Sequence, residues 1–313
     1  NGDDDDDGGD GAGTPVAVKL LNGPINKLGV QAVHAEVFLL RLLRHPNCVR
    51  FIGMVAEPTA HRRIGVVMEL MAGGDLATAY AALAVEGRWL PWRSRLNVLV
   101  QIARGLEYLH TLPPPGPLAH GDLKPYNVLL ERRDCTGRAV IADFTAAESN
   151  ARTIRTQTRN ASRGARREER ASVGVGGGDG SLAYLSPERA RGAGPSKAAD
   201  LWAFGCVMCE LAWQRPPFHE RAWSTTVLLD KLKGGEAPTL PPDGRDDGSG
   251  PAPPLFAGVD AADAAAAASA AQRLRADYRA LAQACLAPDA VERPCAREAA
   301  DRLSKMAAQL ADE

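Results

Sequence analysis

The sequence lacks any apolar run of the roughly 18 residues that a membrane-spanning helix needs, and its first residues lack the pattern of a signal peptide. It also lacks a charge excess, because 37 Lys and Arg stand against 38 Asp and Glu and give a formal net charge of −1. No global field therefore recruits nucleic acid or an acidic membrane surface. Function must be read from local sites, and a cytoplasmic location is expected.

Cysteines are few, and their spacing matches no disulfide framework. Cys206 and Cys209 form a Cys-x-x-Cys pair inside an apolar run, without a second pair that could complete a zinc site. We interpret both as buried helical thiols, which fits a reducing compartment.

Residues 1–13 consist almost entirely of Asp and Gly, with five consecutive carboxylates from Asp3 to Asp7. Such a segment has nothing apolar to bury and is predicted to be disordered. A calcium loop would need alternating ligands and a closing Glu, which are absent here. The chain begins at Asn1 and not at Met, so upstream targeting segments are left open.

The most informative stretch is a polar loop that begins at His120 and runs into the apolar residues 128–130. Phosphoryl transfer needs a carboxylate that accepts a hydroxyl proton, a cation that neutralises phosphate and a group that holds magnesium. Asp122, Lys124 and Asn127 supply these three groups close together in the sequence.

This loop resembles the catalytic loop of the protein kinase family, and Lys124 favours the Ser/Thr type. The resemblance implies that Asp122 and Lys124 are catalytic and that Asn127 binds magnesium. Gly121 departs from the family pattern, which has Arg there and uses it to gather a phosphate on the activation segment. We therefore expect activity without phosphorylation of that segment, unless the Arg-rich residues 152–170 substitute.

Two segments extend the resemblance toward the N-terminus. Residues 14–21 alternate and are rich in β-branched side chains, which predicts a strand. The family likeness implies that Lys19 pairs with the ATP phosphates and that Ala17 covers the adenine. Residues 30–43 have apolar side chains at helical spacing, and Glu36 is the implied partner of Lys19. Taken alone, the first segment fits an ordinary edge strand equally well.

Residues 64–71 are almost continuously apolar and predict a buried strand, which the glycines of residues 72–76 interrupt. This pattern resembles the hinge between the two kinase lobes. Plain core packing of its methionines is compatible with that role. The nucleotide-binding residues implied around the hinge are Met68 as gatekeeper, Glu69 and Met71 through backbone groups, Asp75 toward the ribose, and Leu129.

The next motifs follow in family order. An amphipathic helix is predicted over residues 96–110, and a hairpin over 128–142 leads to Asp143, the implied main magnesium ligand. Thr145 replaces the usual Gly, and a β-branched residue there restricts the backbone. Residues 143–188 are predicted to form a long activation segment.

The chain then resembles the family's substrate-binding segment. Ser181 stands where Ser/Thr kinases have a hydroxyl that binds the catalytic Asp and Lys, and Glu188 is expected to pair with Arg293. Asp200 begins an apolar helix and is expected to hydrogen-bond the catalytic-loop backbone. Residues 241–271 are rich in Pro, Gly and Ala and are predicted to be a low-complexity insertion.

The sequence before Lys19 does not contain Gly-x-Gly-x-x-Gly, and its glycines lie too close to that Lys. We expect the first two family strands and their phosphate-covering loop to be missing from this chain. The predicted fold is α+β and two-lobed. It comprises an acidic segment (1–13), a partial small lobe (14–71) and a mostly helical large lobe (72–313).

Two functions stay open. One is an enzyme that transfers the γ-phosphate of ATP, with Mg²⁺, to Ser or Thr of a protein substrate. It is favoured by the intact set of implied site residues, which are Lys19, Glu36, Asp122, Lys124, Asn127 and Asp143. Gly121, Thr145 and the missing Gly-rich loop favour a pseudokinase scaffold or a nucleotide-binding signalling module without phosphotransfer. We favour the enzyme, from the tyrosine-kinase-like branch of Ser/Thr kinases. The oligomeric state is left open.

Overall fold

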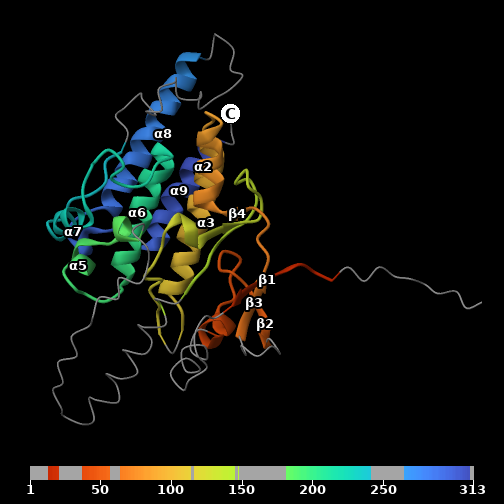
Figure 1. The fold of residues 1–313 in the computed structure, drawn as a ribbon. Helices are drawn as coiled ribbons and strands as arrows, with labels where there is room; N and C mark the ends of the chain where they lie inside the picture. The colour runs from red at the N-terminus through yellow and green to blue at the C-terminus, as the bar shows by residue number, and fades with distance from the viewer. Residues whose placement is uncertain are drawn as a thin grey trace, which may run out of the picture.

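The computed structural model describes residues 13–20, 37–56, 64–113, 116–144, 147, 181–240 and 264–310. Within these residues, a small lobe built on a sheet lies against a larger, mostly helical lobe (Figure 1). The predicted two-lobed α+β fold is therefore confirmed. Predictions for residues 1–12, Glu36, Thr145 and residues 148–180 lie outside the described part of the chain.

The small lobe contains a three-stranded antiparallel sheet in the order β1-β3-β2. Its strands are β1 (Val16–Leu20), β2 (Phe51–Ala56) and β3 (Ile64–Glu69), and residues 37–42 are helical. The central strand β3 fully buries Val66, which pairs across the sheet with Lys19 of β1. The sheet thus places Lys19 on the strand that the sequence predicted.

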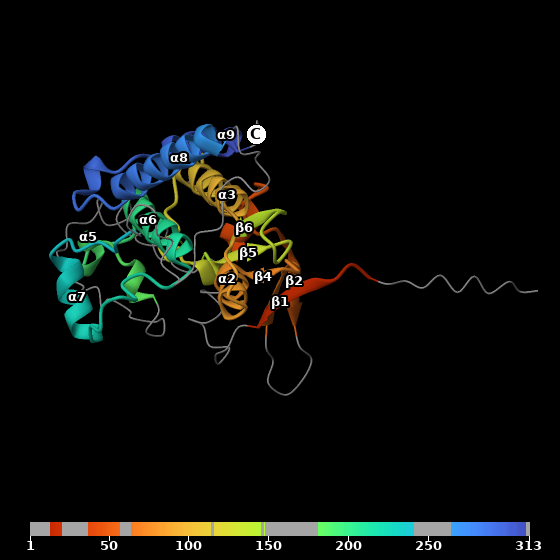
Figure 2. The ribbon, with the colours of Figure 1, turned by 90° about the horizontal axis from the view of Figure 1, so that it is seen from above.

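The large lobe is organised around α6 (Lys197–Trp213), a helix that is apolar on nearly every side and is therefore buried. Two long helices, α3 (Trp92–His110) and α8 (Ala264–Cys285), pack against it, and α9 (Ala296–Gln309) packs on α3 and α8 (Figure 2). The shorter elements are α2 (Leu76–Val85), α5 (Pro187–Ala190), α7 (Thr225–Lys233), and the 3-10 turns η1 (Pro125–Asn127), η2 (Leu182–Tyr184) and η3 (Ala290–Glu292).

A second small sheet positions the catalytic loop. It consists of β4 (Gly74–Asp75), β5 (Val128–Leu130) and β6 (Ala139–Ile141), paired antiparallel in that order. Strand β5 follows directly after η1, and β6 leads to Asp143. The hairpin predicted over residues 128–142 is thus present.

The lobes are joined by hydrogen bonds from the segment that precedes β2. The Val49 N–H donates to the Ile141 carbonyl at 3.0 Å, and the Ile141 N–H donates to the Asn47 carbonyl at 2.9 Å. The Asn47 side-chain amide donates to the Ala139 carbonyl at 3.0 Å. Because Asn47 is buried, these bonds fix the small lobe directly on strand β6.

One boundary was predicted wrongly. The low-complexity insertion was expected to extend to residue 271, whereas α8 already begins at Ala264. The run of alanines from 264 to 268 explains the difference, because Ala has the highest helix propensity of all residues. Cys206 and Cys209 lie buried in α6, as predicted.

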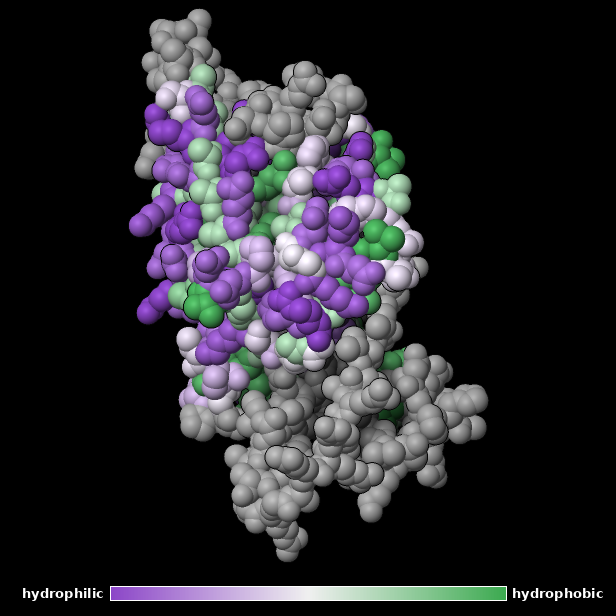
Figure 3. Space-filling model, turned by 90° about the vertical axis from the view of Figure 1, so that its left-hand side faces the viewer, coloured by the Kyte–Doolittle hydropathy of each residue, from purple (hydrophilic) through white to green (hydrophobic). Residues whose placement is uncertain are grey.

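The side of the molecule that carries α7 and α8 is mostly hydrophilic, and its hydrophobic residues form small separate groups (Figure 3). Small groups of this kind are ordinary for a protein surface. Among the helices that the structure describes, none combines the length and apolar character needed to cross a membrane.

Candidate active site

The backbone of the catalytic loop is held by Asp200, which lies in the first turn of α6 and is 2% exposed. Its carboxylate accepts the N–H groups of His120 and Gly121, each at 2.8 Å. The same carboxylate lies 2.8 Å from His110 Nε2, at the C-terminal end of α3. The predicted bond from Asp200 to the loop is present, and His110 is an additional partner that the sequence did not indicate.

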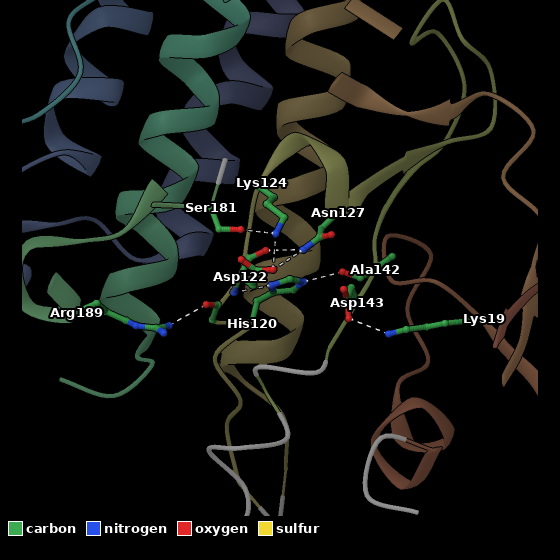
Figure 4. Close-up of polar contacts among 10 residues, drawn as sticks. Lys19, His120, Asp122, Lys124, Asn127, Ala142, Asp143, Ser181 and Arg189 are labelled. Carbon is green, nitrogen blue, oxygen red and sulfur yellow. Dashed lines mark hydrogen bonds and ion pairs between the residues drawn. The ribbon is translucent and has the colours of Figure 1, made fainter. Parts of the chain in front are cut away.

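Asp122 lies at the centre of a cluster of polar side chains (Figure 4). Lys124 Nζ is 2.7 Å from Asp122 Oδ2 and donates to Ser181 Oγ at 2.8 Å. Asn127 Nδ2 donates to the Asp122 carbonyl at 2.7 Å and to its Oδ2 at 3.1 Å. These bonds orient the Asp122 carboxylate, and they bring together the four residues that the sequence placed in one site.

Asp143 lies near this cluster, just after β6, and its carboxylate points toward Lys19 (Figure 4). Its φ of +61° is in the left-handed region, which few side chains adopt without support from their surroundings. Neighbouring contacts provide that support: His120 Nε2 lies 3.0 Å from the Ala142 carbonyl, and the buried Phe144 ring packs on the His120 ring at 5.3 Å. Lys19 Nζ donates to Asp143 Oδ1 at 3.1 Å, so one ion pair spans the two lobes.

The residues predicted to bind the nucleotide base and ribose lie along the strands between the lobes. Ala17 pairs with Met68, and Leu129 pairs with Asp75. The Asp75 carboxylate caps α2, because it accepts both the N–H and the hydroxyl of Thr78 at 2.8 Å. Its contact with a ribose stays a prediction.

The hinge residues Glu69 and Met71 each take part in a backbone hydrogen bond. The Glu69 N–H donates to the Arg50 carbonyl at 3.0 Å, and the Met71 carbonyl accepts the Gly74 N–H at 3.1 Å. Their predicted backbone contacts with adenine stay predictions. The Glu69 side chain forms an ion pair with Arg138. Arg138 Nη1 donates to Glu69 Oε1 at 3.3 Å, and Arg138 Nη2 donates to Glu69 Oε2 through a shorter bond.

The segment predicted to bind the substrate is anchored by an ion pair between Glu188 and Arg293, which was also predicted. Arg293 Nη1 and Nη2 donate to the two Glu188 oxygens at 2.8 and 2.9 Å, and Nη1 also donates to the Ala198 carbonyl at 2.8 Å. Burial opposes ionisation of Glu188, but the hydrogen bonds from Arg293 hold its pKa below the usual value. This forked pair fixes α5 beside the start of α6.

A second buried carboxylate, Glu210 of α6, was not predicted as part of the site. Tyr184 of η2 donates to its Oε2 at 2.5 Å, and Tyr80 of α2 donates to its Oε1. Burial raises the pKa of Glu210 to about 7, against the effect of both tyrosine hydrogen bonds. The cluster ties the substrate segment to the helix that follows the hinge.

The charged residues fit a magnesium nucleotide by the chemistry of their donors. Asn127 commits its amide nitrogen to Asp122, which leaves the amide oxygen as the ligand atom, and Asp143 offers a carboxylate. Mg²⁺ is usually bound by one or two such oxygens together with nucleotide phosphates. No three His, Cys, Asp or Glu side chains in the described residues could hold a metal without a nucleotide.

Comparison with known proteins agrees with this geometry. The protein-family model described as “Protein kinase domain” matches residues 10–303 of the sequence. Human mitogen-activated protein kinase kinase kinase 1 is 29% identical over 245 residues, which are 74% of this chain and 14% of that protein. The serine/threonine-protein kinase VIK of Arabidopsis thaliana is 32% identical over 216 residues, 66% of this chain and 43% of VIK.

Human serine/threonine-protein kinase Nek2 is 30% identical over 224 residues, which are 71% of this chain and 45% of that protein. The chain thus spans less than half of each of these relatives. The family model covers most of the chain, which therefore belongs to the protein kinase family. The branch within that family stays a prediction.

Proposed function

We propose that this protein transfers the γ-phosphate of ATP to Ser or Thr hydroxyls of a protein substrate. The observation that carries the proposal is the position of Lys124 Nζ, which contacts both the Asp122 carboxylate and the Ser181 hydroxyl within 2.8 Å. That arrangement supports the proposal, because phosphoryl transfer needs a proton acceptor and a cation close together.

Each charged side chain has a defined part in this reaction. Asp122 orients the substrate hydroxyl and accepts its proton, while Lys124 neutralises the charge that develops on the transferred phosphoryl group. Asn127 and Asp143 hold Mg²⁺, which supplies charge neutralisation on the phosphates when bound. Lys19 positions ATP and keeps its link to Asp143 across the lobes. Most of the catalysis is positioning and electrostatic stabilisation.

The decisive experiment is phosphotransfer from magnesium-ATP to a mixed set of Ser- and Thr-containing peptides by the purified protein. We expect Asp122→Asn to lower turnover by about 10²–10⁴-fold, the usual contribution of a general base. Asp143→Asn is expected to abolish phosphorylation, because it removes the negative charge of the main metal ligand. Asp230→Asn makes the same change on an exposed helix and serves as the control. Unchanged turnover in both site variants would contradict the assignment.

The alternative is a nucleotide-binding module that signals without phosphotransfer. Gly121 is the observation that favours it, since the family usually has Arg at this position of the loop. The two proposals differ in one measurement: the module binds magnesium-ATP with an affinity that Asp143→Asn weakens, yet transfers no phosphate. Testing the protein with and without about 25 upstream residues, the length of two strands and a turn, also addresses the contribution of a Gly-rich loop.

A further inference from the structure

The peptide group between Gly121 and Asp122 sets the direction of the Asp122 side chain. Its N–H end, on Asp122, donates to His120 Nδ1 at 3.2 Å. The preceding peptide is fixed by the bond from the Gly121 N–H to Asp200. Gly121 itself has φ of +80°, in the left-handed region that Gly reaches without steric cost.

The carbonyl end of the same peptide has a partner from a different element. Arg189 of α5 donates from Nη1 to the Gly121 carbonyl at 2.8 Å (Figure 4). Arg189 directly follows Glu188, which Arg293 anchors through two bonds. The guanidinium therefore approaches the loop from a fixed point, on the side of the substrate segment.

A glycine at position 121 leaves the loop with less restraint of its own, so a contact from outside the loop gains importance. Gly explores more backbone conformations than any other residue, so the peptide before Asp122 gains freedom that a side chain at 121 would restrict. The Asp200 carboxylate holds only the N–H side of Gly121. Rotation of the next peptide would redirect Asp122 while the bonds to Asp200 stayed intact.

The surroundings of Arg189 also fit a charged, fixed group. Burial lowers the pKa of its guanidinium, and the negative charges of Asp200, Asp122 and Glu188 oppose that shift. An arginine remains protonated in proteins, and a hydrogen bond from a charged donor is stronger than one from a neutral donor.

We propose that Arg189 is a positioning residue that holds the Gly121 carbonyl and thereby aims Asp122 at the substrate hydroxyl. Arg189 thus restrains the loop from outside, because Gly121 has no side chain that could restrain it. The inference rests on the proposed phosphotransfer function for its effect on turnover, but the contact itself can be tested without that function.

The test compares Arg189→Met and Arg189→Lys with Arg191→Met in the whole protein. Arg191 is a matched control, since its Nη1 also donates to a backbone carbonyl, that of Lys233, at 2.6 Å and away from the loop. Two readouts are measured: steady-state kinetics with binding of magnesium-ATP, and amide hydrogen exchange of the peptide over residues 118–124. Circular dichroism verifies that each variant is folded.

We expect Arg189→Met to lower kcat by about 10–100-fold, the usual effect of a displaced catalytic group. Nucleotide binding should change by less than about twofold, because ATP contacts other residues. Exchange of the loop amides should become about tenfold faster. Arg189→Lys keeps one charged donor and should lie between wild type and Arg189→Met, whereas Arg191→Met should match wild type.

Two results would overturn the proposal: equal loop exchange in Arg189→Met and Arg191→Met, or a fall in kcat without faster loop exchange. An inactive wild-type protein would instead overturn the proposed phosphotransfer. In that case the exchange comparison alone decides whether Arg189 holds the loop, so the two failures are distinguishable. If both Arg189 variants fail to fold, a positioning role is rejected in favour of a general structural one.

Discussion

Helix α6 and strand β1 both contribute charged residues to the candidate site, in opposite surroundings. In α6, fourteen of seventeen residues are buried, including Asp200 at 2% exposure. In β1, Val16, Val18 and Leu20 are 41–46% exposed, and the Lys19 side chain is 35% exposed. The half of the site that we propose to face the substrate is thus built into the core, whereas the half assigned to ATP lies on a surface strand.

This difference separates two ways of holding a functional group. The catalytic loop is fixed by a buried carboxylate with several donors, so moving it requires breaking interactions that stabilise the whole lobe. Lys19 lies on β1, whose backbone pairs with β3, and its side chain makes contacts such as that with Asp143. Substitutions in the two halves should therefore affect stability and activity in different proportions. The predictions below run from the largest expected change in stability to the smallest.

Asp200→Ala should cause the largest change, because it leaves the N–H groups of the buried His120 and the half-buried Gly121 without their partner. We expect the free energy of unfolding to fall by about 3–5 kcal/mol, the usual cost of breaking a buried charged network. Chemical denaturation measures it. Asp230→Ala, on a side chain that is 69% exposed, should change stability by less than about 0.5 kcal/mol. Equal losses of unfolding free energy in the two variants would show that Asp200 does not stabilise the core of the lobe.

Glu210→Gln should remove a pH dependence of stability. The Glu210 pKa is raised from 4.5 to about 7 in the folded protein, so its contribution is complete below about pH 4.5 and is lost as the pH rises through about 7. Relative to the variant, wild type should therefore lose up to about 3 kcal/mol between these pH values.

The measurement is urea denaturation of both proteins across that pH range. Replacing the carboxyl group by an amide changes the free energy of unfolding by an amount that does not vary with pH. Only the pH dependence of the difference in unfolding free energy between wild type and Glu210→Gln is therefore informative. Glu86→Gln makes the same change on an exposed side chain and provides the control. A flat difference for Glu210→Gln would mean that the two tyrosines keep Glu210 ionised at all these pH values.

The parts of the molecule that the sequence predicted best are those with a local signal. Asp122, Lys124 and Asn127 lie in one short loop, and α3 and β3 have clear apolar patterns, so their positions follow from spacing. Ser181 and Arg293 were assigned partners only through the family resemblance. The Ser181 hydroxyl accepts from Lys124 and Arg293 pairs with Glu188, whereas the expected bond from Ser181 to Asp122 stays a prediction.

The contacts that were missed join residues far apart in the sequence. Tyr80 and Glu210 are 130 positions apart, and no periodic pattern relates them. Arg189 carried no sequence signal, because its role depends on the left-handed conformation of Gly121, 68 positions away. The departure from the family motif at Gly121 was visible in the sequence. Arg189, the residue that we propose compensates for it, could be identified only from the folded structure.

One substitution made in both regions tests the comparison directly. Val207→Ala removes two methyl groups from a fully buried position in α6, and Val18→Ala removes them from a position in β1 that is 46% exposed. We expect losses in unfolding free energy of about 2–3 kcal/mol for the first and below about 1 kcal/mol for the second. Thermal denaturation measures both. Similar losses would indicate that β1 is as tightly packed as α6.

Lys19→Met should change stability least and still remove function. The Lys19 side chain is partly exposed and its ion pair with Asp143 is of the kind that contributes at most about 1 kcal/mol. Phosphotransfer should nevertheless fall by more than about 10²-fold, since a charge aimed at the ATP phosphates is lost. Lys305→Met, an exposed site on α9, is the matched control for both measurements. A loss of several kcal/mol in Lys19→Met would assign this Lys to the fold as well as to the site, and the contrast between the two halves would then disappear.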